Sequence, residues 1–257
     1  MKVLQILPQL NIGGVERGTL DLSKALIHKG HESFVISGGG ILVDELEQLG
    51  AKHYEIPVHI KSLRTLSLAK SLSETISSID PDIVHIRSRM PAWVNYRAFK
   101  MLQKKPLLVS TFHGLYSFPI YSKVMSFVDH SIAISKTVES YILENYKLDK
   151  NDITVIPRGC DPVEFNNDEI NPDDKAEIIN EFPQIVGKTV LTIPGRITKW
   201  KGVAEFIELL SLLDDNYHGL IVGPTAKSKK KYLNKLQNKV SSLDLENKIT
   251  FTGSRRD

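Results

Sequence analysis

The sequence predicts an α/β protein made of two doubly wound layers, each a mostly parallel sheet with helices on both faces. Two observations lead to this prediction. Short apolar runs, of the length of buried strands, alternate with amphipathic segments of helical period along most of the 257 residues. The alternation lapses once, between about residues 164 and 187, where Asn, Asp and Pro cluster, and then resumes. The fold class is therefore two Rossmann-like layers joined by a linker.

The first layer is expected to span residues 1–164. Its strands are expected over residues 3–7, 33–37, 53–56, 83–86, 107–111, 131–134 and 154–156. Its helices are expected over residues 15–29, 42–49, 66–79, 92–102 and 137–146. Gly13-Gly14 separates the first strand from the first helix, and Asp80-Pro81 ends the helix before the fourth strand. Right-handed crossovers turn this alternation into a doubly wound layer.

A linker over residues 165–187 and a partial second layer over residues 188–257 complete the predicted organisation. Strands are expected over residues 190–193, 220–222 and 249–252, with helices over 203–213 and 230–243. A doubly wound layer usually has about five or six strands. We therefore expect the sequence to be truncated at its C-terminus, with a small three-stranded appendage as the alternative.

Composition excludes several classes of protein. With 41% hydrophobic and 25% charged residues, the chain is neither disordered nor collagen-like, and a net charge of +3 does not indicate nucleic-acid binding. The single cysteine, Cys160, cannot form an internal disulfide, which favours a cytoplasmic location. Residues 83–128 carry only positive charges, so they form either a solvated helix face or a surface for anionic substrate or the inner face of a membrane.

Glycines and cations follow the predicted strands of both layers. Since ligands of open α/β sheets bind outside the carboxyl ends of the strands, these residues predict a positively charged cleft for a phosphate-bearing ligand. The candidates are Gly13, Gly14, Arg87, Arg89, His113, Gly195, Arg196 and Lys201. No zinc-ligand spacing occurs among the eight histidines, so no metal is expected.

Each candidate also has a structural interpretation. Gly13-Gly14 could bind an anion at the start of a helix or simply form a tight turn. Arg196 and Lys201 precede a predicted helix, where cations are unfavourable unless they share an anion such as a diphosphate; ordinary surface cations are the alternative. His113 either bonds a sugar hydroxyl, acts as acid or base, or makes one backbone bond. Arg87 and Arg89 either bind a charged acceptor or pair with neighbours.

Four segments carry a resemblance to a known family. They are Gly13-Gly14-Val15-Glu16, Thr111-Phe112-His113-Gly114, Ile156-Pro157-Arg158-Gly159-Cys160-Asp161, and Pro194-Gly195-Arg196 with Trp200-Lys201-Gly202. With them the chain resembles, from Met1 to Asp257, the family 4 glycosyltransferases of GT-B fold. The stretch from His85 to Trp93 is similar to a bacterial subgroup linked to lipopolysaccharide-type glycans.

The resemblance implies a metal-independent, retaining transfer of a sugar from a UDP- or GDP-linked donor to a glycan or lipid-linked acceptor of the cell envelope, with no cofactor. It implies that Arg196 and Lys201 neutralise the donor diphosphate and that His113 bonds the donor sugar. Gly13, Gly14 and Gly195 would approach the donor, and Gly253 and Arg255 would border its base. Glu16, Arg87 and Arg89 would contact the acceptor.

Two departures from the family pattern bear on these expectations. The family's Glu-x7-Glu donor motif would lie beyond Asp257, so the chain as written is expected to bind donor poorly and to be inactive. Arg158 stands where the family often has Asn, which leaves the role of this position open. A non-catalytic nucleotide- or sugar-binding module remains an alternative, as does another GT-B enzyme such as a nucleotide-sugar epimerase.

Overall fold

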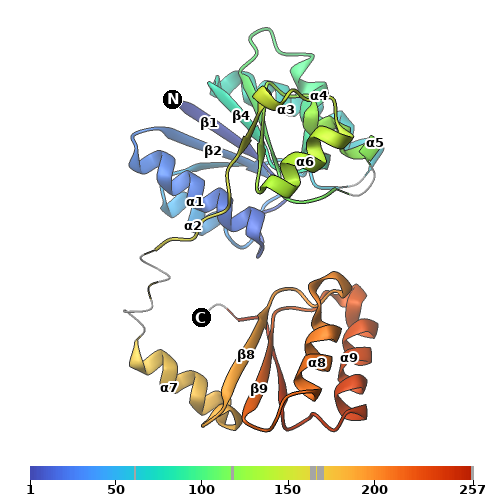
Figure 1. The fold of residues 1–257 in the computed structure, drawn as a ribbon. Coiled ribbons are helices and arrows are strands. Elements are labelled where there is room, and N and C mark those ends of the chain that lie inside the picture. Colours follow the sequence, from blue (N-terminus) through green and yellow to red (C-terminus); the bar gives the residue numbers. More distant parts are fainter. Residues whose placement is uncertain (61, 117–118, 163–165, 167–170, 256–257) are drawn as a thin grey trace. The chain divides into compact units, whose positions relative to one another are not determined.

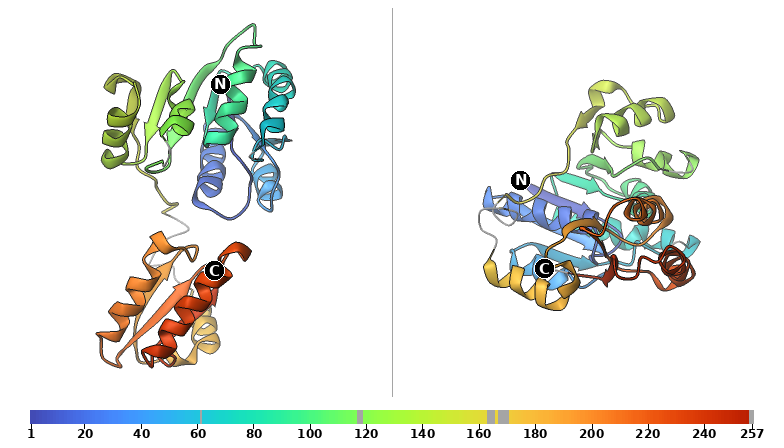
Figure 2. Two further views of the ribbon diagram at one scale, coloured as in Figure 1. Left: turned by 90° about the vertical axis from the view of Figure 1, so that its right-hand side faces the viewer. Right: turned by 60° about the horizontal axis from the view of Figure 1, so that its bottom comes forward.

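The computed structural model describes residues 1–60, 62–116, 119–162, 166 and 171–255. The chain divides into two compact units, Met1–Cys160 (unit 1) and Asp161–Asp257 (unit 2). Figure 1 shows both units with many of their elements labelled, and Figure 2 gives two further views. No helix among the described residues is long and apolar enough to cross a bilayer.

Unit 1 is built on a seven-stranded sheet with the order β3-β2-β1-β4-β5-β6-β7. Every neighbouring pair of strands is parallel. The strands are β1 (Lys2–Ile6), β2 (Glu32–Ser37), β3 (Lys52–Glu55), β4 (Ile83–Ile86), β5 (Leu107–Phe112), β6 (His130–Ala133) and β7 (Ile153–Val155). This order and direction confirm the predicted doubly wound layer.

Helices cover both faces of this sheet (Figures 1 and 2). They are α1 (Gly14–His28), α2 (Val43–Gln48), α3 (Ala69–Ile79), α4 (Arg89–Phe99), α5 (Pro119–Ser122) and α6 (Lys136–Asn145). The first two pack with β2 in one apolar cluster, whereas α3, α4 and α6 pack in a larger cluster. The doubly wound arrangement follows from right-handed crossovers that leave β1 and β4 in opposite directions.

The side chains of β1 alternate between the two faces of the sheet. Leu4 and Ile6 are fully buried in the larger cluster together with Val84 and Ile86 of the neighbouring β4. Gln5, between them, points to the other face and donates from Nε2 to the α1 carbonyl of Thr19 at 3.2 Å. Because side chains alternate along a strand, Gln5 is the residue of this apolar run that faces α1.

The switch point of unit 1 lies between β1 and β4, which are neighbours in the sheet although β2 and β3 come between them in the sequence. The chain leaves β1 through residues 7–13 to start α1, and it leaves β4 through Arg87 and Ser88 to start α4. Ligands of doubly wound sheets bind outside such a point. The fold therefore directs attention to the start of α1 and to the residues that follow β4 and β5.

Unit 2 contains a three-stranded parallel sheet in the order β10-β9-β8. Its elements are α7 (Pro172–Glu181), β8 (Thr189–Pro194), α8 (Val203–Ser211), β9 (Tyr217–Val222), α9 (Lys230–Ser242) and β10 (Ile249–Gly253). Its apolar cluster lies where α8 and α9 pack against the sheet, with Ile207, Leu210 and Leu236 almost fully buried.

Helix α7 lies inside the range that the sequence analysis treats as linker. Asn171 caps it, accepting a hydrogen bond from the Asp173 N–H at 3.0 Å, and Pro172 occupies the first turn. Asn at the cap, Pro at the first position and acidic residues in the first turn are helix-start signals as well as turn signals. Residues 163–165 and 167–170 of the expected boundary and linker lie outside the described part of the chain.

Candidate functional site

Arg87 is the first residue after β4, and it is a buried cation. Its backbone N–H donates to the Ile6 carbonyl at 3.0 Å, which holds it beside the end of β1. The residue is 6% exposed, and Nη1 donates to Gln5 Oε1 at 2.7 Å. The Nε atom is buried and has no hydrogen-bond partner. Among the described residues, no carboxylate pairs with this guanidinium, so the expected alternative of a salt bridge to a neighbour does not apply.

Gln5 orients the guanidinium. Its Nε2 donates to the Thr19 carbonyl at 3.2 Å and to Ser23 Oγ at 3.0 Å, and Ser23 is bonded in turn to Ser33 Oγ at 2.9 Å. With Nε2 committed to α1, the amide oxygen must face Arg87. A neutral amide therefore holds a buried charge at the carboxyl end of the sheet.

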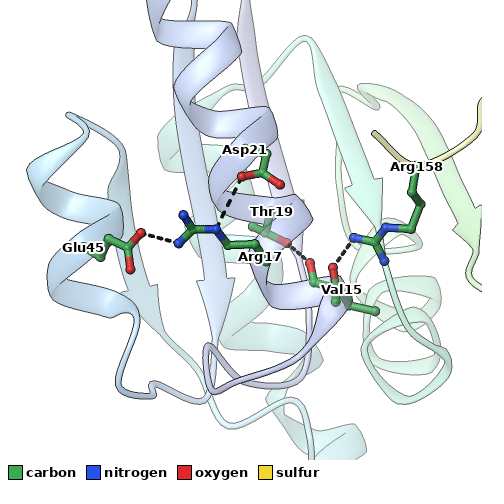
Figure 3. A network of polar contacts seen from close by, with 7 residues as sticks. Val15, Arg17, Thr19, Asp21, Glu45 and Arg158 are labelled. Atoms are coloured by element: carbon green, nitrogen blue, oxygen red, sulfur yellow. Dashed lines mark hydrogen bonds and ion pairs between the residues drawn. The ribbon is translucent and has the colours of Figure 1, made fainter. Parts of the chain in front are cut away.

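Arg158 reaches the same region from the segment after β7 (Figure 3). Its Nη2 donates to the carbonyl of Gly14, in the first turn of α1. A methyl group on Gly18 would overlap Arg158 Nη2 and lie 3.2 Å from Arg87 Nη2, and one on Gly14 would lie 3.3 Å from Arg158 Nη1. Gly14 and Gly18, one helical turn apart, therefore leave room for the Arg158 guanidinium, and both arginines face one small space.

His113 follows β5 and lies near both arginines. Neither ring nitrogen has a partner, although both are buried. Burial, and then the charges of Arg87 and Arg158, lower the pKa of His113 to about 3. Burial, and then the charge of Arg87, hold the pKa of His85 well below its usual range, and His85 Nε2 lies 2.7 Å from Thr111 Oγ1. Both imidazoles are neutral at physiological pH.

Asp21 and Glu16 influence the pKa of Arg87 through their charge, without a hydrogen bond or ion pair to it. Burial, and then Arg158, lower the pKa of Arg87 to about 10, whereas Asp21 and Glu16 raise it. Asp21 is paired with Arg17, whose Nη1 also contacts Glu45 at 2.6 Å (Figure 3). Glu16 folds back over Gly13, since a methyl group there would meet its carboxylate. Arg87 thus stays charged at neutral pH without a contact anion.

Arg89 adjoins this cluster through Tyr116, whose hydroxyl accepts a hydrogen bond from the His113 N–H at 3.3 Å. Its guanidinium stacks on the ring of Tyr116, at 4.9 Å from the centroid, and on that of Tyr121, at 5.4 Å, and it donates to Ser122 Oγ at 3.3 Å. These contacts fix the guanidinium against aromatic faces, an arrangement that suits arginine better than lysine.

In unit 2, Arg196 and Lys201 both lie in the segment between β8 and α8. Each side chain is exposed, and neither forms an ion pair within the part of the chain that the structure describes. Lys201 Nζ lies 4.5 Å from the ring centroid of Trp200. Helix α8 has no side-chain cap at Gly202. The uncapped N-terminus and the two cations that precede it favour an anion, and Glu205 is the acidic residue of the first turn.

Gly195 and Gly223 allow two loops of unit 2 to touch at the carboxyl end of its sheet. Gly223 has φ 147°, and a methyl group on it would collide with the Gly195 carbonyl. Gly195 N–H also donates to the Val222 carbonyl at 2.8 Å. The predicted donor residue Gly195 thus has a clear structural task in joining the loop after β8 to that after β9.

Gly253 and Arg255 lie at the C-terminal end of the described residues. Gly253 has φ 75°, in the left-handed region, with nothing within 4 Å of a built methyl group. Arg255 Nη1 contacts Glu181 Oε2 of α7 at 2.6 Å, and its guanidinium stacks on Phe182 at 5.2 Å. In this structure Arg255 ties the segment after β10 to α7.

The predicted residues thus fall into separate groups. Within unit 1, Gly14, Arg87 and His113 come together with Glu16 nearby, whereas Arg89 stacks on Tyr116 and is joined to His113 through it. The sequence analysis singled out Arg158 but left its role open, and it did not name Gln5 or Gly18. The four-residue spacing of Gly14 and Gly18 is the sequence signal that could have pointed to this site. Within the described residues, no group of three His, Cys, Asp or Glu side chains could hold a metal ion.

Comparison with known proteins identifies related chains. A human relative, one of the subunits of phosphatidylinositol N-acetylglucosaminyltransferase, is 25% identical over 187 residues, which are 66% of this chain and 38% of that protein. An uncharacterized glycosyltransferase of Methanocaldococcus jannaschii is 32% identical over 148 residues, 51% of this chain and 36% of that one. The matched segments thus span little more than a third of these curated relatives.

Solved structures resemble the whole chain. A glycosyltransferase from Rickettsia africae has a TM-score of 0.85 and 33% identity, with 100% of this chain and 69% of that chain covered. Anabaena HepE, in complex with UDP and glucose, has a TM-score of 0.82 and 19% identity, with 100% and 70% covered. This likeness confirms the predicted GT-B fold class.

Two family models match the sequence, one in each unit. The model "Glycosyl transferases group 1" matches residues 174–257. The model "Glycosyltransferase Family 4" matches residues 12–164, which include the start of α1, Arg87, His113 and Arg158. The segments on which the resemblance rested lie inside these matches, and the chain belongs to Glycosyltransferase Family 4.

Proposed function

We propose that the protein transfers a sugar from a UDP- or GDP-linked donor to a glycan or lipid-linked acceptor of the cell envelope, with retention at the anomeric carbon and without a metal ion. The observation that carries this proposal is the pair Arg196 and Lys201 at the free N-terminus of α8. Family membership supports glycosyl transfer, and the proposal extends it to donor, stereochemistry and acceptor.

The donor assignment rests on charge. A nucleotide-sugar leaves its sugar behind as a nucleoside diphosphate, so negative charge grows on the leaving phosphate in the transition state. Arg196 offers a planar fork and Lys201 a point charge, and both suit phosphate oxygens. Fixed cations and helix N–H groups can stabilise such charge without a metal ion. The solved complexes of HepE with UDP and with UDP-glucose support a nucleotide-sugar donor.

His113 would bind the transferred sugar rather than the donor phosphate. Its pKa of about 3 keeps the ring neutral at physiological pH, so it is not a charged general acid there. A neutral imidazole with two unpartnered nitrogens can donate one hydrogen bond and accept another. We therefore assign it to a hydroxyl of the transferred sugar.

The acceptor assignment is supported by relatives. WaaG, with a TM-score of 0.72 and 14% identity, is described as a glycosyltransferase involved in lipopolysaccharide biosynthesis, and the human relative is named for phosphatidylinositol. The exposed cations of the acid-free stretch 83–128, among them Arg97, Lys105 and Lys123, support peripheral contact with anionic lipid on the cytoplasmic face of the membrane. Glu16, Arg87 and Arg89 are the proposed acceptor residues.

Calorimetric titration of the protein with UDP, GDP, UDP-glucose and GDP-mannose tests the donor assignment. Arg196→Ala and Lys201→Ala should each weaken binding about tenfold or more, since hydrogen bonds to charged groups contribute roughly 1.5–3 kcal/mol. The matched control is Lys235→Ala on the exposed face of α9, which should change nothing.

Transfer is measured on the same proteins, with and without EDTA, and the anomeric configuration of the product is read by NMR. Unchanged turnover in both cation variants would contradict the site assignment. Loss of turnover in EDTA, or an inverted product, would contradict the proposed mechanism. Donor binding without transfer would favour the non-catalytic module, and isomerised donor would favour the epimerase.

A further inference from the structure

Unit 1 carries a second concentration of positive charge, separate from Arg196 and Lys201. We propose that Arg87, Arg158 and the first turn of α1 form a pocket for a phosphate group carried by the acceptor. This inference rests on the proposed function and adds to it the chemical class of the acceptor. The two arginines are brought together by the fold, since they follow different strands of the same sheet.

The two guanidinium groups converge. Both lie beside Gly18, where an added methyl group would overlap Arg158 Nη2 and lie 3.2 Å from Arg87 Nη2. Arg158 is held by the Gly14 carbonyl and Arg87 by Gln5 Oε1, so each is tethered by one neutral acceptor and retains further donors. Two arginine forks facing one space are a geometry that a tetrahedral phosphate can satisfy with several hydrogen bonds.

The energetics favour an incoming anion. A buried charge without a contact partner is unfavourable by several kcal/mol relative to a paired one. Arg87 is 6% exposed, its Nε is buried without a partner, and the neighbouring charge is the like charge of Arg158. An anion between the arginines would relieve this repulsion and pair with the buried charge.

None of the acidic side chains that the structure describes near Arg87 and Arg158 occupies the space between the two guanidinium groups. Asp21 is paired with Arg17, and Glu16 is folded over Gly13 at the start of the helix. His113 and His85 are neutral and add no competing charge. The N-terminus of α1 lacks a side-chain cap, and its dipole adds to the attraction for an anion. No group of the described chain supplies the missing negative charge to Arg87 at contact distance.

The acceptor, rather than the donor, is the source of this phosphate in our proposal. The donor diphosphate already has cations of its own on unit 2, at the start of α8. A separate pair on unit 1 would fix the acceptor by its anion and leave a hydroxyl free to attack. The pocket would therefore select acceptors that carry phosphate over neutral sugars.

The test uses the full 257-residue chain, with inorganic phosphate, glucose 6-phosphate and glucose as probes in calorimetry and thermal-shift assays. Phosphate and glucose 6-phosphate should bind, and glucose should not. Arg158→Asn and Arg87→Gln should each weaken phosphate binding about tenfold or more, because each removes charged hydrogen bonds. Lys136→Gln, which removes an exposed cation of α6 outside residues 83–128, is the matched control. Gly18→Ala should weaken binding as well, by displacing Arg158.

An experiment with lipid vesicles distinguishes a lipid-linked phosphate from a soluble one. Vesicles of phosphatidylcholine with and without phosphatidylinositol are compared in a flotation assay on the same variants. Arg158-dependent binding of the phosphatidylinositol vesicles identifies a lipid-linked phosphate, and Arg158-dependent binding of glucose 6-phosphate alone identifies a soluble one. Equal binding of all probes to wild type and Arg158→Asn overturns the proposal.

Titration with UDP distinguishes this inference from the proposed function. We expect UDP binding to depend on Arg196 and Lys201 and to survive Arg158→Asn. UDP binding that depends on Arg158 as strongly as phosphate binding does would assign the pocket to the donor and overturn the inference. Arg158-dependent phosphate binding in a protein whose UDP binding is unchanged by Arg196→Ala and by Lys201→Ala would refute the proposed donor site while leaving the pocket in place.

Discussion

Gln5→Leu should destabilise unit 1, and the size of the effect can be worked out from the contacts of Arg87. The substitution removes the oxygen that lies 2.7 Å from Arg87 Nη1 and leaves an arginine of 6% exposure without this partner. A hydrogen bond to a charged group contributes roughly 1.5–3 kcal/mol, and an unpartnered buried charge adds to the loss. We expect unfolding of unit 1 to become easier by about 2–4 kcal/mol.

Arg87→Met and the double variant complete a thermodynamic cycle. Arg87→Met removes the buried charge but leaves Gln5 Oε1 unpaired, at a cost of about 1–2 kcal/mol. The double variant replaces both partners by apolar side chains, and apolar replacement of a buried polar pair is often neutral or stabilising. The double variant should therefore be more stable than Gln5→Leu alone, with a coupling energy of about 2 kcal/mol.

The two tryptophans make this measurable for one unit at a time. Trp93 lies in α4 of unit 1 and Trp200 in unit 2, and the chain has no other tryptophan. In a Trp200→Phe background, urea unfolding followed by fluorescence reports on unit 1. A coupling energy below about 0.5 kcal/mol would refute the reasoning, because it would mean that the amide does not hold a buried charge.

Three further predictions concern pH, a loop and a helix cap. Between about pH 6.5 and pH 3 the unfolded chain protonates His113 while the folded chain does not, so stability should fall by about 1–2 kcal/mol from pH 7.5 to pH 5, and urea unfolding of His113→Gln should show a shallower fall. Gly223→Ala adds a methyl group where the Gly195 carbonyl lies, at φ 147°, and should destabilise unit 2 by about 2–4 kcal/mol in Trp200 fluorescence; an unchanged midpoint would contradict the close loop contact. Ser135→Ala removes the cap of α6 and should cost unit 1 about 1 kcal/mol in urea unfolding followed by Trp93 fluorescence, whereas no change would mean that this cap is not formed in solution.

Much of the fold could be predicted from the order of apolar and amphipathic segments. All seven predicted strands of unit 1 and all three of unit 2 appear in the structure within a few residues of the expected bounds. This works because a strand buried on both faces needs a short, mostly apolar run, and each crossover helix needs one apolar face. Helix α7 was not predicted, because Asn171-Pro172 can begin a helix as readily as a turn.

The candidate site was predictable only as a location. Arg87 and His113 each follow a predicted strand. Because the carboxyl ends of parallel strands lie at one edge of the sheet, the sequence predicts that both residues lie at that edge. The local sequence around Gly13-Gly14 indicated an anion site or a tight turn and could not decide between them. The structure adds that Gly14, together with Gly18, makes room for an arginine from the far end of unit 1.

By itself the amino-acid sequence determined the class of layer, the parallel strands and the residues that stand at their ends, because these depend on local periodicity and on chain order. Only the tertiary structure decided that Arg87 is buried against Gln5 rather than paired with an acid, and that Arg158 reaches the first turn of α1 from the far end of unit 1. The physical reason is that the partner and burial of a charge depend on side chains brought together by several strands and helices, and no local pattern records which of them meet.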